Sequence, residues 1–300
     1  MAPMTGTVVT DWKPDIASSP KDLKGKNVAV IGGTSGLGRA IALKAAEDGA
    51  NVTVVGRSFK DDPDKIHFIK ADLSSMKEAK RIGETIDPLV DVVVFTTGIF
   101  AKAERVETEE GIELDMAVSY LSRLVILKFL VPRLTKKPTR VFIMGFPGGA
   151  LDPINVDDLN SEKSYKGGPD WVHFNTVAGN EALVLDWSKV SKDVKFYGLN
   201  PGVIKTGIRG NIYESGIMYY LGPVVEFLLG LFMPSPESYA ATMVHVLFCP
   251  TLDEHSGASF NPQGLPVESS QIFIKDDQLV SKFITGSESL VKDKTGMKFP

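Results

Sequence analysis

The sequence has little cysteine and no long apolar run. Cys249 is its one cysteine, so no internal disulfide can form, and a solitary thiol is typical of a reducing compartment. It lies in an apolar stretch, where a buried small side chain is the simplest interpretation. No run of about 18 apolar residues is present, and residues 1–20 lack the basic start and apolar core of a signal peptide. We therefore expect a cytoplasmic protein without a transmembrane helix.

Positive charge is not in excess either. The 33 lysines and arginines against 37 acidic residues give a formal net charge of −4, which argues against nucleic acid or an anionic membrane as a partner. Hydrophobic residues make up 43% of the 300 residues, enough to bury a large core. No repeat, low-complexity segment or linker divides the chain, so we expect a single domain.

Short apolar runs alternate with stretches of helical periodicity. Residues 27–31 are dominated by Val, Ala and Ile, as in a strand buried on both faces of a parallel sheet. We predict strands at 27–31, 51–55, 66–69, 90–96, 141–144, 194–199 and 258–261, and helices at 39–48, 75–86, 111–134, 175–190 and 235–248. This alternation implies an α/β fold with a doubly wound, Rossmann-type parallel sheet and helices on both faces.

The expected domain covers residues 25–264. An N-terminal arm at 1–24 precedes it, a C-terminal extension at 265–300 follows it, and residues 205–234 are expected to form a lid over one end of the sheet. Local signals mark some helix ends. They are Gly49 after the first helix, a capping box of Ser75 and Glu78, and Ser235 with Pro236 before a later helix.

A glycine-rich turn joins the first strand to the first helix. It consists of Gly32, Gly33, Thr34, Ser35, Gly36, Leu37 and Gly38. Glycines let the backbone turn tightly and approach a pyrophosphate, which then rests at the positive end of the helix. Because a strand precedes this turn and a helix follows it, the turn predicts a dinucleotide site rather than a plain connection.

The end of the second strand bears on which cofactor is bound. Dinucleotide folds that bind NAD usually place an acid there, whereas this sequence has Gly56 followed by Arg57. A cation suits a 2′-phosphate, so NADP(H) is favoured over NAD(H). The alternative is a solvated arginine at a strand end.

The spacing of Gly32, Gly36 and Gly38 resembles that of the short-chain dehydrogenase/reductase family, in the branch of retinol-dehydrogenase-like enzymes. The likeness covers about residues 24–264. Further matching segments are Asp72 and Leu73, residues 95–98, 111–114 and 154–159, and Asn200 to Val203 with Thr206. The resemblance implies that Asp72 and Leu73 contact the adenine, that Thr97 and Gly98 follow the fourth strand beside the cofactor, and that Pro201, Gly202, Val203 and Thr206 lie along the nicotinamide. It also leaves a homo-oligomer possible.

The usual catalytic residues of that family are missing. Its typical member uses a tyrosine as proton donor with a lysine four residues later, and no tyrosine of this sequence has a lysine at that spacing. Aligned with the family, Thr176 stands at the tyrosine position, Asn180 at the lysine, Phe146 at the serine and Ser119 at the asparagine. An aliphatic hydroxyl is a far poorer acid than a phenol, and Asn180 brings no charge, although it can still hydrogen-bond a ribose.

Three residues could replace the missing proton donor. His173 lies three residues before Thr176 and could donate a proton, or it is simply a partly exposed histidine. Tyr165 and Asp152 could act from loops, and for all three the surface interpretation is favoured. Trp171, Tyr219, Tyr220, Phe227 and Phe232 could line an apolar substrate pocket, pack the lid onto the domain, or do both.

Three functions follow, in decreasing order of preference. The first is an atypical enzyme that acts on an apolar small molecule by hydride transfer to an activated acceptor, or by a redox-neutral cyclisation or isomerisation. The second is a non-catalytic NADP(H)-binding protein, since the cofactor motifs are kept while the catalytic ones are lost. The third is a carbonyl reductase with a relocated proton donor, His173 or Tyr165.

Overall fold

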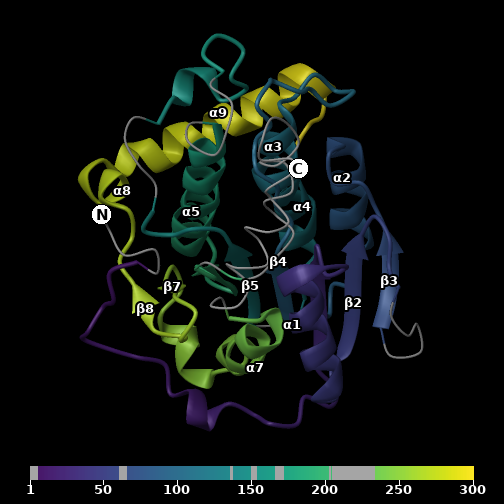
Figure 1. The fold of residues 1–300 in the computed structure, drawn as a ribbon, viewed down its shortest axis with the longest axis vertical. Coiled ribbons are helices and arrows are strands. Elements are labelled where there is room, and N and C mark those ends of the chain that lie inside the picture. The colour runs from purple at the N-terminus through teal and green to yellow at the C-terminus, as the bar shows by residue number, and fades with distance from the viewer. Residues whose placement is uncertain are drawn as a thin grey trace, which may run out of the picture.

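The structure is a computed structural model, and it describes residues 6–60, 66–135, 138–149, 154–165, 172–202, 204 and 234–300. Several expectations lie outside the described residues: the lid at 205–234 except for Pro234, the aromatic residues expected beneath it, and Asp152, Val203 and Thr206. The described part forms one sheet with helices on both of its faces (Figure 1).

The sheet has eight strands in the order β3-β2-β1-β4-β5-β6-β7-β8. Their bounds are β1 Asn27–Ile31, β2 Asn51–Gly56, β3 Ile66–Lys70, β4 Val92–Phe95, β5 Thr139–Met144, β6 Val194–Leu199, β7 Ser259–Phe260 and β8 Pro266–Val267. All pairings are parallel except that of β7 with β8. The predicted doubly wound sheet is therefore confirmed. Because β1 lies between β2 and β4, the strand order reverses there, and ligands bind at the carboxyl ends of the strands beside such a point.

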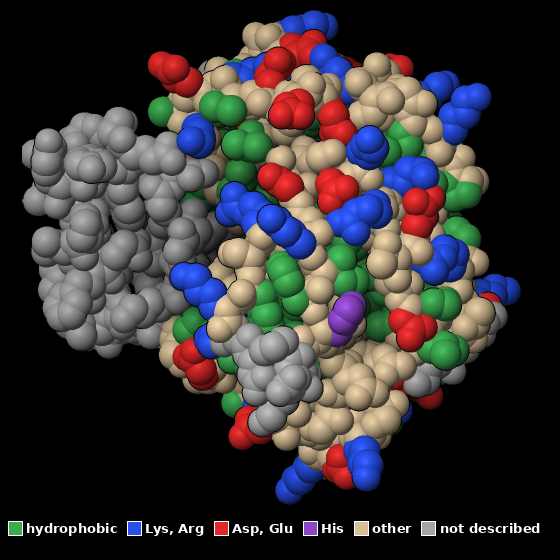
Figure 2. All heavy atoms as spheres, turned by 90° about the vertical axis from the view of Figure 1, so that its right-hand side faces the viewer, with side chains coloured by type: hydrophobic (Ala, Val, Ile, Leu, Met, Phe, Trp, Pro, Cys, Tyr) green, Lys and Arg blue, Asp and Glu red, His purple; other side chains and the backbone are tan. Residues whose placement is uncertain are grey.

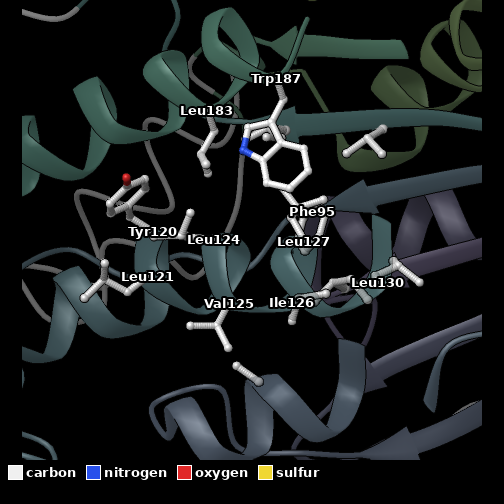
Figure 3. Packing of buried hydrophobic residues seen from close by; sticks show 14 of the residues in the cluster. Phe95, Tyr120, Leu121, Leu124, Val125, Ile126, Leu127, Leu130, Leu183 and Trp187 are labelled. Atoms are coloured by element: carbon white, nitrogen blue, oxygen red, sulfur yellow. The ribbon is translucent and has the colours of Figure 1, made fainter. Parts of the chain in front are cut away.

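Helices cover both faces of this sheet. They are α1 Gly36–Glu47, α2 Met76–Thr85, α3 Leu114–Met116, α4 Ser122–Leu130, α5 Val172–Val190, α7 Pro236–Leu247, α8 Gln271–Lys275 and α9 Asp277–Thr295. Residues of α1 and α7 pack in one apolar core, and those of α2, α4, α5 and α9 in another. Figure 3 shows the second core, in which Phe95 of the sheet lies among Leu127 of α4 and Trp187 of α5.

The predicted helix ends are formed by the expected local contacts. Gly49 has φ +100° and its N–H donates to Ala46 O, which closes α1. Ser75 Oγ accepts from Glu78 N at 3.4 Å at the start of α2. At the start of α7, the Ser235 side chain accepts from Ser238 N in the same way.

The long helix expected at 111–134 differs in detail. It begins at Leu114, because the Glu113 carboxylate accepts from Met116 N at 2.7 Å and caps it. It then widens into a π-type turn, η2 (Ala117–Leu121), before α4 continues it. We refer to α3, η2 and α4 together as the central helix. Wide turns of this kind are frequently found at functional sites.

The two terminal segments pack on the sheet and its helices. Val9 N in the arm donates to Pro266 O of β8 at 2.9 Å, and β8 was not predicted. The helices α8 and α9 were not predicted either, and α9 lies across α5 (Figure 1). The division at residues 24 and 264 stays a proposal. On the face that carries α2 and β3, basic and acidic side chains of the described residues are interspersed (Figure 2).

Candidate active site

The glycine turn is held tightly against the ends of β1 and β4. Gly32 has φ +94°, and a Cβ built on it would lie 2.6 Å from Thr97 N. A Cβ on Gly38 would lie 2.3 Å from Thr96 Oγ1. Gly36 has φ +52°. Side chains at these three positions would clash or strain the backbone, so the glycines are needed for the turn itself.

The turn leaves the N-terminus of α1 open. Ser35 is the N-cap residue, but its side chain accepts no hydrogen bond from the helix, and the first turn contains no acid. Ser35 and Gly36 are exposed, while Leu37 is half-buried against the core. The N–H groups and positive dipole end of a twelve-residue helix thus face outward, which is the environment that a phosphate group prefers.

Arg57 lies beside this turn. A Cβ on Gly56, the last residue of β2, would lie 2.5 Å from the Thr34 methyl, so the end of β2 touches the turn. Arg57 follows directly and is exposed. After β3, Asp72 is exposed and accepts from both Ser74 N and Ser74 Oγ, while Leu73 is buried. Asp72 therefore shapes the turn after β3.

The remaining cofactor candidates lie at the ends of β4 and β6. Thr97 and Gly98 follow β4 and are half-buried. After β6, Gly202 has φ +64° and its N–H donates to Asn200 Oδ1 at 2.9 Å, which fixes the bend at Pro201. The structure thus brings these segments to the same edge of the sheet as the glycine turn.

Two rows of polar side chains face each other between the central helix and α5. The central helix contributes Asp115, Ser119 and Arg123 at four-residue spacing, and α5 contributes His173, Thr176 and Asn180. All are buried except His173, which keeps 18% of its side chain exposed. Buried polar groups on this scale require partners, and the two rows supply them to each other.

The first cross-connection joins Asp115 to His173. His173 Nδ1 lies 2.8 Å from Asp115 Oδ2, and the Asp115 side chain is fully buried. An ionised carboxylate can only accept, so the proton is on Nδ1, and Nε2 is the nitrogen left for chemistry. Ser119 Oγ donates to the other carboxylate oxygen at 2.5 Å and accepts from Ile99 N at 3.0 Å. The edge of the Phe100 ring meets the imidazole, with centroids 4.6 Å apart.

Thr176, at the position of the missing tyrosine, is a minor part of this arrangement. It is 1% exposed, and its hydroxyl donates to His173 O at 2.8 Å. The same oxygen is 3.5 Å from His173 Nδ1. The hydroxyl is therefore used within α5, and the imidazole is the protonatable group next to it.

The second cross-connection joins Arg123 to Asn180. Arg123 Nη1 donates to Asn180 Oδ1 at 2.8 Å and to Met144 O, while Nη2 donates to Thr97 O. Asn180 Nδ2 donates to Ser119 O and to Thr176 O. Both donors and one acceptor lone pair of the Asn180 amide are thus used inside the protein, which leaves it little capacity for a ribose.

Burial shifts the pKa values of two ionisable side chains in this region, Arg123 and Glu113. Burial lowers the pKa of Arg123 to about 9, and the charge of Asp115 partly offsets this, so the guanidinium is charged at neutral pH. Burial raises the pKa of Glu113, at the start of the central helix, to about 7, and the neighbouring Asp115 adds to the rise. One carboxyl of this pair therefore titrates near neutral pH while the other is held by His173 and Ser119.

The other candidates lie farther from these contacts. The Phe146 ring lies over Gly149, where an added Cβ would be 2.1 Å from the ring, and it is half-buried against the core. Tyr165 donates its hydroxyl to Lys102 O at 2.7 Å, and burial raises its pKa to about 12. A phenol with that pKa is a weaker acid than an ordinary tyrosine and is poorly suited to donate a proton near neutral pH.

Sequence reasoning identified His173 but missed Asp115 and Arg123. The available signal was the four-residue spacing of Asp115, Ser119 and Arg123 on a helix that is otherwise apolar. Such residues form one stripe, and a polar stripe on a buried helix marks a site. Among the described residues, no three His, Cys, Asp or Glu side chains lie together in a group that could hold a metal ion.

The chain was compared with known proteins. The family model described as short chain dehydrogenase matches residues 26–143. A Saccharomyces cerevisiae protein named as an uncharacterized oxidoreductase is 45% identical over 280 residues, which cover 89% of this chain and 88% of that protein. The chain belongs to the short-chain dehydrogenase/reductase family. It thus has the fold of a family of oxidoreductases, as its motifs predicted.

Two proteins of lower identity also resemble this chain. Retinol dehydrogenase 14 of Homo sapiens is 24% identical over 272 residues, covering 80% of this chain and 79% of that protein. A short chain dehydrogenase of Shigella flexneri, solved in complex with NADP, superposes with a TM-score of 0.58 at 13% identity, covering 81% of this chain and 100% of that one. The human protein shows a likeness to retinol dehydrogenases at low identity, and the Shigella structure shows that the fold is shared. No helix within the described ranges is long and apolar enough to cross a membrane.

Proposed function

We propose that this chain is an NADP(H)-dependent reductase of an apolar carbonyl compound, in which His173 donates the proton. The observation that carries the proposal is the 2.8 Å contact of His173 Nδ1 with the buried Asp115 carboxylate. With a proton donor of this kind next to the tyrosine position, an activated acceptor or a redox-neutral reaction is no longer required. The third function expected from the sequence therefore becomes the first.

The residues present fit a nicotinamide dinucleotide. The open N-terminus of α1 and the close-packed glycines suit a pyrophosphate, and the exposed Arg57 beside Thr34 suits a 2′-phosphate. Asp72, Gly98 and Pro201 would lie along the same edge. When bound, the reduced cofactor supplies the hydride for the carbonyl carbon.

The protein's own part in the reaction is to hold and move one proton. Asp115 accepts from His173 Nδ1 and fixes the imidazole orientation, and Ser119 fixes Asp115 in turn. As the carbonyl carbon gains hydride, its oxygen takes the proton from His173 Nε2, which gives the alcohol. The imidazole then recovers a proton from water, to which it is partly exposed.

The surroundings of His173 favour an apolar substrate. The Phe100 ring is half-buried and packs against the imidazole. Apolar walls with a few convergent polar groups are typical of small-molecule sites. We therefore expect aldehydes and ketones with hydrocarbon or aromatic substituents to be reduced.

The test is oxidation of NADPH by purified protein with a panel of such carbonyl compounds. Replacing His173 by Ala should lower kcat at least about 100-fold, the contribution of a positioned general acid. Asp115→Asn should lower it as well, because the imidazole loses the group that orients it. His67, an exposed histidine on β3, gives the matched control, and His67→Ala should keep the full rate.

Two results would contradict the proposal. If His173→Ala retains the wild-type kcat, the proton comes from elsewhere. If the folded protein binds NADPH but reduces nothing in the panel, the non-catalytic alternative is the better description.

A further inference from the structure

Arg123 is a buried cation beneath the carboxyl ends of the two central strands. It is 3% exposed, and its guanidinium donates to Thr97 O, just beyond β4, and to Met144 O, the last residue of β5. Thr97 N in turn lies against Gly32 of the glycine turn. The positive charge is therefore held at the edge of the sheet where ligands of this fold bind.

The charge of Arg123 is only partly compensated. Its hydrogen-bond partners are two backbone carbonyls and the Asn180 amide, all neutral. Its Nε–H has no acceptor among the described residues. Asp115 is the acid whose charge acts on it, and that carboxylate is engaged by His173 and Ser119. A cation in this environment produces a positive potential that solvent screens weakly.

We propose that Arg123 makes this site bind the reduced nicotinamide cofactor more tightly than the oxidised one. The nicotinamide ring of the oxidised cofactor is positively charged and that of the reduced cofactor is neutral, so only the oxidised form is repelled. The inference rests on the proposed cofactor function and deepens it, since a site with this bias favours reduction over oxidation. Arg123 acts here as a positioning and electrostatic residue.

The expected size of the effect follows from Coulomb's law. Two unit charges about 10 Å apart at an effective dielectric constant of about 20 change a binding constant on the order of tenfold. The wild-type Kd for NADP⁺ should therefore exceed that for NADPH by about this factor. Both constants can be measured without turnover, NADPH by its fluorescence and NADP⁺ by competition.

Two substitutions of Arg123 separate charge from structure. Arg123→Gln removes the charge but keeps hydrogen-bond donors, and it should reduce the ratio of the two Kd values about tenfold, towards one. Arg123→Lys keeps the charge and should keep the ratio. If Arg123→Gln weakens both affinities equally and leaves the ratio unchanged, Arg123 is merely structural and the inference is wrong.

If the two Arg123 variants fail to fold, a third variant tests the same inference. Asn180→Asp places a carboxylate oxygen 2.8 Å from Arg123 Nη1, although it gives up the two hydrogen bonds that Asn180 Nδ2 donates to Ser119 O and Thr176 O. It neutralises the cation and should also lower the ratio about tenfold, and an unchanged ratio would overturn the inference. If the wild type binds neither form, it is the proposed function that fails. If it binds both and the ratio is insensitive to these changes, the function stands and the inference falls.

Discussion

At the scale of single residues, burial decides how each polar side chain of the site behaves. Asp115 is fully buried and tied to two donors, whereas Glu113 is just as buried but sits at a helix start. The Glu113 carboxyl accepts from Met116 N, and this does not offset its desolvation. Burial therefore raises the pKa of the Glu113 carboxyl to about 7.

Glu113 gives a prediction about stability and pH. Its pKa is raised from 4.5 to about 7 in the folded protein, so the folded state binds more protons than the unfolded state between those values. Stability is therefore lost as the pH rises from about 4.5 to above 7, by up to about 3 kcal/mol. Glu113→Gln should remove this loss.

The measurement is urea unfolding of both proteins at pH 5 and pH 8. Gln still accepts from the helix N–H, so the substitution keeps the cap while removing the charge. The wild type should lose more stability than the variant between the two pH values. Equal losses would show that Glu113 is ionised at both.

Individual site residues were predictable only where the sequence has a motif. The glycine turn and Arg57 were singled out because backbone geometry and phosphate chemistry favour those residue types in that order, and their role in binding a cofactor stays a prediction. Asp115 was not singled out, because no residue near it in the sequence indicates that it contacts His173. His173 lies 58 positions away, and only the packing of α5 on the central helix brings the two together.

At the scale of elements, Gly179 of α5 lies at a close contact between helices. A Cβ on Gly179 would lie 2.7 Å from the Tyr120 ring of the central helix and 2.8 Å from the Phe283 ring of α9. These two rings meet edge to face, with centroids 5.5 Å apart. The glycine therefore allows three helices to cross at one point, and it fixes the distance between the two polar rows.

Gly179→Ala should destabilise the protein although Ala is the better helix former. The added methyl must displace two buried rings, which typically costs about 1–3 kcal/mol. The gain in helix propensity is about 1 kcal/mol, so the net loss of stability is up to about 2 kcal/mol. Gly286→Ala on α9 is the control, because its Cβ would meet the end of the Leu159 side chain at 3.2 Å and Val156 O at an ordinary contact distance of 3.8 Å. Denaturant unfolding should show a loss for the first and little change for the second, and equal stabilities would refute the packing argument.

Strands and capped helices were the predictable elements. The apolar runs for β1, β2 and β6 and the caps of α2 and α7 appear in the structure within a few residues of their expected places. The segment 271–295 was not predicted, although Leu279, Val280, Phe283, Ile284, Leu290 and Val291 recur at helical spacing. Packing of this apolar face in the core that includes α5 then holds the helix on the domain.

At the scale of the whole molecule, the doubly wound sheet and the family were predictable and the chemistry was not. Alternating strands and helices permit few topologies, and the observed order is one of them. The proposed replacement of a tyrosine and a lysine by a histidine–aspartate pair depends on contacts between distant segments. Fold and family therefore constrain the reaction class, and the side-chain contacts are needed to assign the residues.

The most direct measurement is the affinity of the purified protein for NADPH and for NADH, in the wild type and in Arg57→Ala. We predict that NADPH binds at least about tenfold more tightly than NADH and that Arg57→Ala loses about tenfold of the NADPH affinity alone, since it removes a charged contact to the 2′-phosphate. Lys60→Ala, which removes an exposed cation three residues away, should change neither affinity. Saturable NADPH-selective binding with this pattern would support an NADP(H)-dependent reductase. Absence of binding by either dinucleotide would contradict it.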